Sequence, residues 1–224
     1  MCPIRIRRTA AGLALAGLVT GSALAQSPDC VVIEDFSAAT VSQLPPEWKL
    51  RKEAGKGVYG VREEGGLRFL RGVSEGLGIQ AARAFEWDLA KYPVLTWSWR
   101  PQQFPQGADE RRSATNDSAL AVYVMVPYSK IQGPKAVKYI WSERVPVGER
   151  LSSNNGLTQV RVLRPGRDGA GQWQDERVNA RDDFRSFFNE AQPPRPAGIA
   201  VLTDADDTRS TAAGDYANFR ACSS

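Results

Sequence analysis

Short hydrophobic runs, rich in Val, Ile, Trp and Tyr, recur along this chain of 224 residues, and clusters of Gly, Pro, Asn and Asp separate them. Runs of this length, bounded by turn residues, are typical of β-strands. The predicted strands are residues 30–36, 58–62, 67–71, 77–82, 94–100, 119–126, 136–142, 158–164, 173–178, 198–203 and 216–221. Many short strands at this spacing predict an all-β fold, a single antiparallel β-sandwich of the jelly-roll, concanavalin-like or galactose-binding-like kind.

The hydrophobic pattern has a helical period only in residues 182–191. There Phe184, Phe187 and Phe188 stand at positions i, i+3 and i+4, which places the three rings on one face of a helix. We therefore expect one short helix that packs its phenylalanine face against the sheet.

Alternation within the strands sorts side chains onto two faces, because successive residues of a strand point in opposite directions. Leu95, Trp97 and Trp99 share one face of their strand. In the next predicted strand, Tyr123 and Met125 lie opposite a face made of Leu and Val. Strands that are hydrophobic on both faces are expected at the centre of the sheets.

The first 25 residues have the pattern of a secretory signal peptide. Arg5, Arg7 and Arg8 precede an apolar run, and small residues end it at Ala25. The run is too short to span a membrane as a helix, and no later segment is long enough either. We expect cleavage after Ala25 and a periplasmic or secreted protein of residues 26–224, which form one domain and do not insert into the membrane.

Removal of the leader changes the charge balance. The full chain carries 29 Lys and Arg against 25 Asp and Glu, a net charge of +4, and three of the basic residues belong to the leader. The exported chain then has a net charge of only +1. A strongly basic surface is the electrostatic signature of nucleic-acid binding, so a nucleic-acid partner is not expected.

Two of the three cysteines, Cys30 and Cys222, remain in the exported chain. Paired cysteines in an oxidising compartment usually form a disulfide. We expect a bond between them that ties the first strand to the last; two free thiols are the alternative.

The composition excludes several kinds of site. The chain contains no histidine, which rules out Ser-His-Asp and Cys-His catalysis, histidine-ligated zinc and facial-triad iron. With both cysteines in a disulfide, thiolate chemistry is excluded as well. Carboxylates, tyrosines and arginines are the side chains left to form a site, and no cofactor is expected apart from a structural calcium ion.

An acidic turn separates the last two predicted strands. Asp204, Asp206 and Asp207 lie in it, and Asp215 and Asn218 follow, so hard oxygen ligands of the type that calcium prefers gather around one corner. The spacing does not fit an EF-hand loop. The interpretations are an ordinary hydrogen-bonded turn, a calcium site or a catalytic acid.

Asp117 stands at the start of the predicted strand 119–126, after a long polar loop. If the fold brings it beside Asp204 and Asp206, the carboxylates could act as acid and base on a glycosidic bond. The alternative is an Asx turn that begins a strand.

Aromatic side chains offer a third kind of site. Trp97, Trp99, Tyr123 and Trp141 could form a platform on which sugar rings stack. The alternative is that these large rings fill the core between two sheets.

Several segments, in order along nearly the whole exported chain, resemble an uncharacterised family of secreted bacterial proteins, domain of unknown function 3047. They are EDF at residues 34–36, PEW at 46–48, PVLTWSW at 93–99, ND at 116–117, YIWS at 139–142, WQDERVN at 173–179, TDADDT at 203–208 and Tyr216. Two segments depart from the family pattern: Tyr216-Ala217-Asn218-Phe219 stands where Tyr-Gly-Asp-Ile is expected, and Asn116-Asp117 where two aspartates are usual. The resemblance implies a fold but no activity.

The sequence favours a non-catalytic exported binding domain for a glycan or another cell-envelope polymer. A carboxylate-dependent glycoside hydrolase or polysaccharide lyase that uses Asp117 with Asp204 or Asp206 is the first alternative, and a structural protein of envelope assembly is the second.

Overall fold

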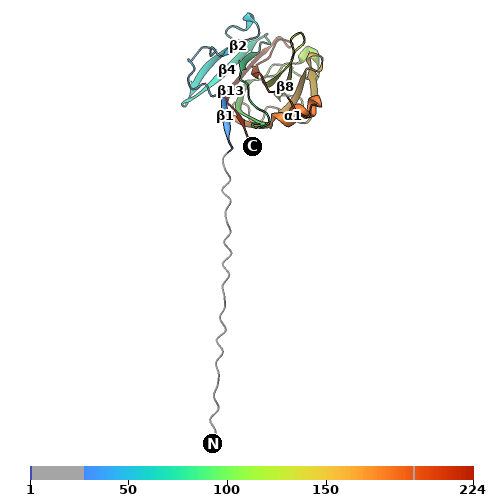
Figure 1. The fold of residues 1–224 in the computed structure, drawn as a ribbon. Helices are drawn as coiled ribbons and strands as arrows, with labels where there is room; N and C mark the ends of the chain where they lie inside the picture. The colour runs from blue at the N-terminus through green and yellow to red at the C-terminus, as the bar shows by residue number, and fades with distance from the viewer. Residues whose placement is uncertain (2–27, 194) are drawn as a thin grey trace.

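The computed structural model describes Met1, residues 28–193 and residues 195–224. The predicted signal peptide lies outside the described residues except for Met1. Two β-sheets packed face to face make up the described chain (Figure 1), as the strand pattern predicts. No described helix has the length and apolar character needed to cross a membrane.

The first sheet has six strands in the order β11-β6-β13-β4-β3, and β1 also pairs with β13. The bounds are β1 Cys30–Glu34, β3 Tyr59–Glu64, β4 Leu67–Glu75, β6 Val94–Gln103, β11 Gln174–Asn179 and β13 Thr211–Cys222. The long strand β13 is the centre of this sheet, since its first half pairs with β4 and its second half with β1. A bulge lies between Ala217 and Arg220, where Asn218 takes a left-handed conformation (φ 58°) that asparagine tolerates better than most residues.

The second sheet has seven strands in the order β2-β5-β12-β7-β8-β10-β9. The bounds are β2 Trp48–Leu50, β5 Ala81–Ala84, β7 Leu120–Ser129, β8 Gly133–Ser142, β9 Arg150–Ser153, β10 Thr158–Pro165 and β12 Gly198–Leu202. Neighbouring strands are antiparallel except β8 and β10, which run parallel because the chain passes through the edge strand β9 between them. The short strands β2 and β9 are absent from the predicted set.

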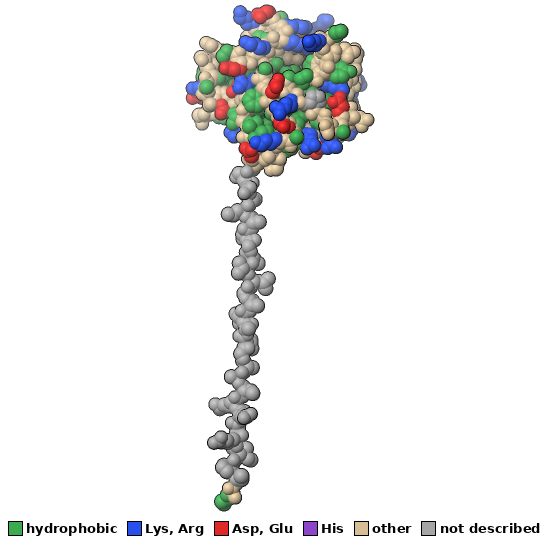
Figure 2. Space-filling model, viewed as in Figure 1, with side chains coloured by type: hydrophobic (Ala, Val, Ile, Leu, Met, Phe, Trp, Pro, Cys, Tyr) green, Lys and Arg blue, Asp and Glu red, His purple; other side chains and the backbone are tan. Residues whose placement is uncertain are grey.

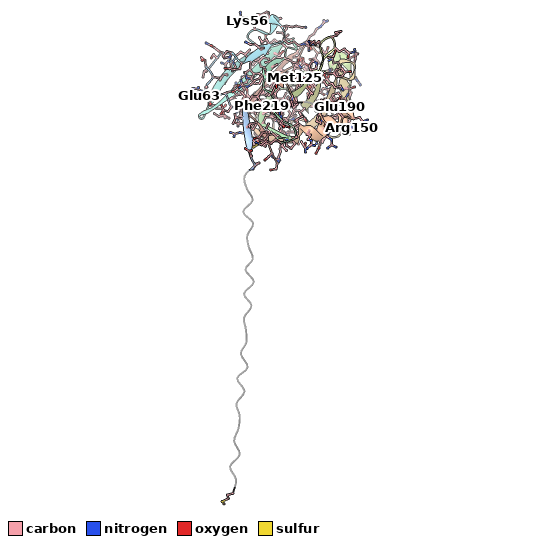
Figure 3. All side chains as sticks on the ribbon, in the orientation of Figure 1. Lys56, Glu63, Met125, Arg150, Glu190 and Phe219 are labelled. Atoms are coloured by element: carbon pink, nitrogen blue, oxygen red, sulfur yellow. A yellow bond between two sulfur atoms is a disulfide. The ribbon has the colours of Figure 1, made fainter. Side chains whose placement is uncertain are left out.

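The core fills the space between the sheets with aromatic rings from both sides. Trp97 of β6 contacts Tyr139 of β8 with ring centroids 5.7 Å apart, and Trp99 contacts Trp141 at 6.1 Å. Phe219, labelled in Figure 3, belongs to the same core. Charged side chains of both signs are spread over the face drawn in Figure 2.

One α-helix, α1 (Ala180–Phe188), packs against β6, β8 and β11. The side chain of Asn179 accepts a hydrogen bond from the Asp182 backbone N–H and caps its first turn. Phe184 is fully buried and packs on Phe188, so the predicted phenylalanine stripe is confirmed. Figure 3 shows Arg150 and Glu190 beside this helix. Short 3-10 turns occur at η1 (Glu53–Gly55), η2 (Ser113–Thr115) and η3 (Asn154–Gly156).

The predicted disulfide is confirmed. Cys30 lies opposite Cys222 in the pairing of β1 with β13, and a bond joins their sulfur atoms across 192 positions of sequence. The bond clips the first strand of the fold to the last, beside the C-terminus (Figure 1).

Candidate functional site: a groove and an acidic corner on the seven-stranded sheet

A groove of about 390 Å³ lies on the outer face of the seven-stranded sheet, the face turned away from the core. In register across the sheet, Ala82, Ala200, Tyr123 and Lys138 lie on this face. The small side chains of Ala82, Ala200 and Ala136 leave space above the strands. The groove is lined by Lys49, Leu50, Arg51, Gln80, Ala82, Tyr123, Met125, Gln132, Gly133, Pro134, Ala136, Asn154 and Thr158.

The groove has an apolar floor and a polar rim. Tyr123 and Met125 of β7, with Ala82 and Ala136, form the floor; Met125 is labelled in Figure 3. Alternation along β7 puts these two side chains on the outer face because Val122 and Val124 point into the core. The rim consists of basic and amide side chains, and none of the lining residues is an aspartate or glutamate.

Two charged side chains, Lys138 and Glu110, are buried against the outer face of β8. Lys138 of β8 is opposite Tyr123, with its ammonium nitrogen 5.7 Å from the centre of the tyrosine ring. Burial acts to lower the pKa of Lys138, but the neighbouring Tyr123, Asp204 and Glu110 together hold that pKa above its usual value. The amino group therefore stays charged in a nearly closed environment.

Glu110, from the loop between β6 and β7, approaches the same face of β8. Ser118 and Ser142 donate hydrogen bonds to its carboxylate over 3.1 and 2.5 Å. Burial raises the pKa of Glu110, and the hydrogen bond from Ser142 opposes this shift.

The turn that follows β12 carries the acidic residues, and two tyrosine hydroxyls hold it in place. Tyr216 donates to the carbonyl of Leu202 over 2.8 Å and contacts the hydroxyl of Thr203 at 3.0 Å. The hydroxyl of Tyr59 accepts a hydrogen bond from the Thr203 backbone N–H and donates to the carbonyl of Ile79. Both rings reach across the core from the six-stranded sheet, so the position of this turn depends on the packing of the whole sandwich.

Asp117 lies beside this turn, as one of the sequence hypotheses required. Its carboxylate is fully buried and accepts hydrogen bonds from the backbone N–H groups of Asp207 and Thr208, at 3.2 and 2.8 Å, and from the Thr208 hydroxyl at 2.5 Å. Asp117, Asp204, Asp206 and Asp207 form the group that we name the acidic corner. In it, Asp117 has a structural duty, since it closes the turn onto the start of β7.

Asp204 is the buried acid of the corner, with 7% of its surface exposed. Its backbone bridges to Gly78 and donates to the carbonyl of Ser118 over 3.0 Å. Burial raises the pKa of Asp204 to about 8; Lys138 opposes this rise, and Asp117 and Asp206 add to it. A Cβ atom on residue 78 would come within 2.5 Å of the Asp204 carboxyl oxygen, so glycine at this position lets the carboxyl pack there.

Asp117, Asp206 and Asp207 each offer a carboxylate oxygen, and these atoms all lie within 4.8 Å of one another. Asp206 and Asp207 are exposed, whereas Asp117 is buried. One short segment links the corner to the groove: Gln80, which lines the groove, is two residues from Gly78, against which Asp204 and Asp206 pack.

Asp215 and Asn218, which the sequence analysis placed around the same corner, lie elsewhere, and that expectation is wrong. Asp215 points to the outer face of the six-stranded sheet, where it pairs with Arg71 at 2.7 Å and Arg100 at 2.9 Å. Asn218 donates to the hydroxyl of Ser98. The period of two on β13 explains the error, because Asp215 must point away from the core when Tyr216 points into it.

The predicted aromatic platform is wrong for its three tryptophans. Trp97, Trp99 and Trp141 are at most 1% exposed, because they face the core and not the solvent. The indole N–H of Trp99 donates to Glu176, and that of Trp141 donates to the carbonyl of Gly166. Of the predicted platform, Tyr123 lines the groove on the seven-stranded sheet.

Sequence reasoning did not identify Glu110, Lys138, Arg51 and Gln80. Lys138 carries a signal that could have been used, because it is a charged residue inside the hydrophobic segment 136–142. Arg51 and Gln80 flank strands of only three and four residues, which leave little periodicity to read.

No curated protein matches this chain in sequence. A glycoside hydrolase domain, Endo-D from Streptococcus pneumoniae R6, is similar in structure with 6% identity and a TM-score of 0.36, over 77% of this chain; the present chain spans about a fifth (21%) of that one. A carbohydrate-binding module specific for non-crystalline cellulose, CBM28, has 12% identity and a TM-score of 0.40, over 87% of this chain and 92% of the other. A cellulase derived from Cel12A of Rhodothermus marinus has 13% identity and a TM-score of 0.43, over 88% and 100%.

A family model described as "Protein of unknown function (DUF3047)" matches residues 46–220. The match covers most of both sheets, including the groove, the acidic turn and the tyrosines that hold the turn in place. The chain belongs to the DUF3047 family.

Proposed function

We propose that this protein is an exported, non-catalytic domain that binds a glycan of the cell envelope in the groove on the seven-stranded sheet. The observation that carries the proposal is the groove itself, a hollow of about 390 Å³ with an apolar floor and a polar rim. Its size lies within the range of small-molecule and oligomer subsites.

The two parts of the groove suit the two sides of a sugar ring. A pyranose ring presents C–H groups on its faces, which pack on apolar surfaces such as the Tyr123 ring and the Met125 side chain. Its hydroxyls extend sideways, where Gln80, Gln132 and Arg51 can donate and accept hydrogen bonds. Lys49 and Arg51 also favour a polymer that carries carboxylates.

Export is supported by the disulfide. A bond between Cys30 and Cys222 persists only where thiols are oxidised, which excludes a reducing cytosol in most organisms. A periplasmic or secreted location agrees with the predicted leader, and it places the groove in contact with envelope polymers.

Binding without hydrolysis is supported by the position of the carboxylates. A glycosidase needs two carboxyl groups on either side of the bond that it cleaves, and no aspartate or glutamate lines the groove. Both carboxylate oxygens of Asp117 accept hydrogen bonds from the turn, which leaves this residue poorly placed to act as a base.

The test is calorimetry of residues 26–224 with a panel of soluble polysaccharides and peptidoglycan fragments. We expect at least one ligand to bind, and we expect Arg51→Ala and Gln80→Ala to weaken its binding by about tenfold or more, as loss of a central contact does. Arg177→Ala is the matched control, since Arg177 is exposed on β11 of the other sheet.

Absence of binding across the panel, or equal binding by the groove variants and the control, would contradict the proposal. The first result would favour the structural role in envelope assembly. Release of reducing sugar that disappears in Asp204→Asn and Asp206→Asn would instead favour the hydrolase alternative.

A further inference from the structure

The acidic corner brings oxygen atoms to the separation that one metal ion requires. The three oxygens from Asp117, Asp206 and Asp207 lie within 4.8 Å of one another. Oxygens on opposite sides of a calcium ion are about 5 Å apart, because each Ca–O distance is roughly 2.3 to 2.6 Å. A single ion of this size can therefore contact all three carboxylates.

A second, independent feature points to a ligand in the same place. The Oδ1 atom of Asp204 is buried and has no hydrogen-bond partner among the described residues. It packs against Gly78 next to Asp206: a Cβ atom on residue 78 would lie 2.5 Å from this oxygen and 2.8 Å from Cγ of Asp206. A buried carboxyl oxygen without a hydrogen-bond donor or cation is costly, and a metal ion bound by Asp206 would bring a positive charge next to it.

The protein supplies little positive charge to this corner. Within residues 28–193 and 195–224, none of the four carboxylates forms an ion pair with lysine or arginine. Lys138 is the cation whose charge reaches both Asp204 and Asp207. One ammonium group cannot balance the three carboxylates of Asp117, Asp206 and Asp207, so a divalent cation would relieve repulsion that the fold otherwise retains.

The carboxylates of the acidic corner are held in place, and solvent can reach them. Asp117 is fixed by three hydrogen bonds, and Tyr59 and Tyr216 hold the turn from the core side. Asp206 and Asp207 are exposed and leave a path from solvent. We propose that the acidic corner binds a divalent cation, and calcium best matches ligands that are all carboxylate oxygens.

The test is a calcium titration of chelator-treated protein, residues 26–224. The melting temperature is measured at each calcium concentration, and calorimetry measures the heat of binding. A ligand that binds only the folded state raises the melting temperature, and the stabilisation grows with the logarithm of the ligand concentration above Kd. We expect a rise at millimolar calcium, a smaller one with magnesium, and loss of the rise in Asp206→Asn. Asp168→Asn is the matched control, because Asp168 is an exposed aspartate of another loop.

The metal-free melting temperature of Asp206→Asn separates metal binding from loss of structure. We expect this variant to melt at or above the wild-type temperature in chelator, because it removes like-charge repulsion, and below wild type in calcium. An unchanged wild-type melting temperature at millimolar calcium, or an equal rise in Asp206→Asn and the control, would overturn the proposal. Glycan binding is measured separately, so either proposal can fail without the other.

Discussion

Glu110 shows the effect of burial on a single carboxyl group in this protein. Its pKa is raised by burial, so the folded state holds a proton at pH values where the unfolded chain has lost it. Stability must then fall as the pH rises from the unfolded pKa towards the folded one. This group contributes a pH dependence opposite in sign to that of a paired surface carboxylate.

Glu110→Gln is expected to flatten this dependence. The amide keeps the shape of the side chain and cannot ionise. The free energy of unfolding of the variant minus that of wild type should therefore be larger at pH 8 than at pH 4.5, so the variant gains relative stability at the higher pH. Urea denaturation at the two pH values measures it, with Glu86→Gln, an exposed glutamate, as the control. Equal differences at both pH values would show that Glu110 titrates normally.

At the scale of elements, the first and last strands depend on each other. Among the described strands, β1 pairs with β13 alone, and the disulfide between Cys30 and Cys222 closes a loop of nearly the whole described chain. We expect Cys30→Ser with Cys222→Ser to lower the free energy of unfolding by about 2 to 5 kcal/mol, because the cross-link restricts the unfolded chain.

Denaturation of the double variant measures the change, and wild-type protein in reductant should reproduce it. The groove lies on the other sheet, so glycan binding at temperatures well below melting should persist. An unchanged free energy of unfolding in the double variant would mean that pairing of β1 with β13 holds without the bond.

Strand patterns predicted the elements better than they predicted which face was buried. Alternation correctly separated Tyr123 and Met125 from the core face of β7. It could not decide whether Trp97 and Trp99 face the core or the solvent, because alternation only shows that the two rings share a face of the strand. That choice depends on the other sheet, which supplies Tyr139 and Trp141 as partners.

The candidate site was predictable only in part, because it is assembled from distant segments. Residues 116–117 and 203–208 could be marked as acidic from the sequence, but their contact depends on the pairing of β12 with β7. The requirement for glycine at position 78 is also tertiary, since it comes from carboxyl groups more than a hundred residues away.

At the scale of the whole molecule, one sheet supports the site and the other carries the groove. The six-stranded sheet sends Tyr59 and Tyr216 across the core to hold the acidic turn. The seven-stranded sheet presents the groove on its outer face, and the acidic corner lies just after the end of β12 and before the start of β7. The core aromatics belong to the framework, and binding is expected to depend on small and polar side chains above it.

Met125 allows the central claim to be tested at one atom. The chain has two methionines, Met1 and Met125, so the exported protein should give a single methyl signal when methionine is labelled with carbon-13. Met125 lines the groove. We predict that its signal shifts as the saccharide found by calorimetry is added, and that Arg51→Ala greatly reduces the shift at the same concentration. A signal that stays in place while the saccharide binds would contradict the groove as the binding site.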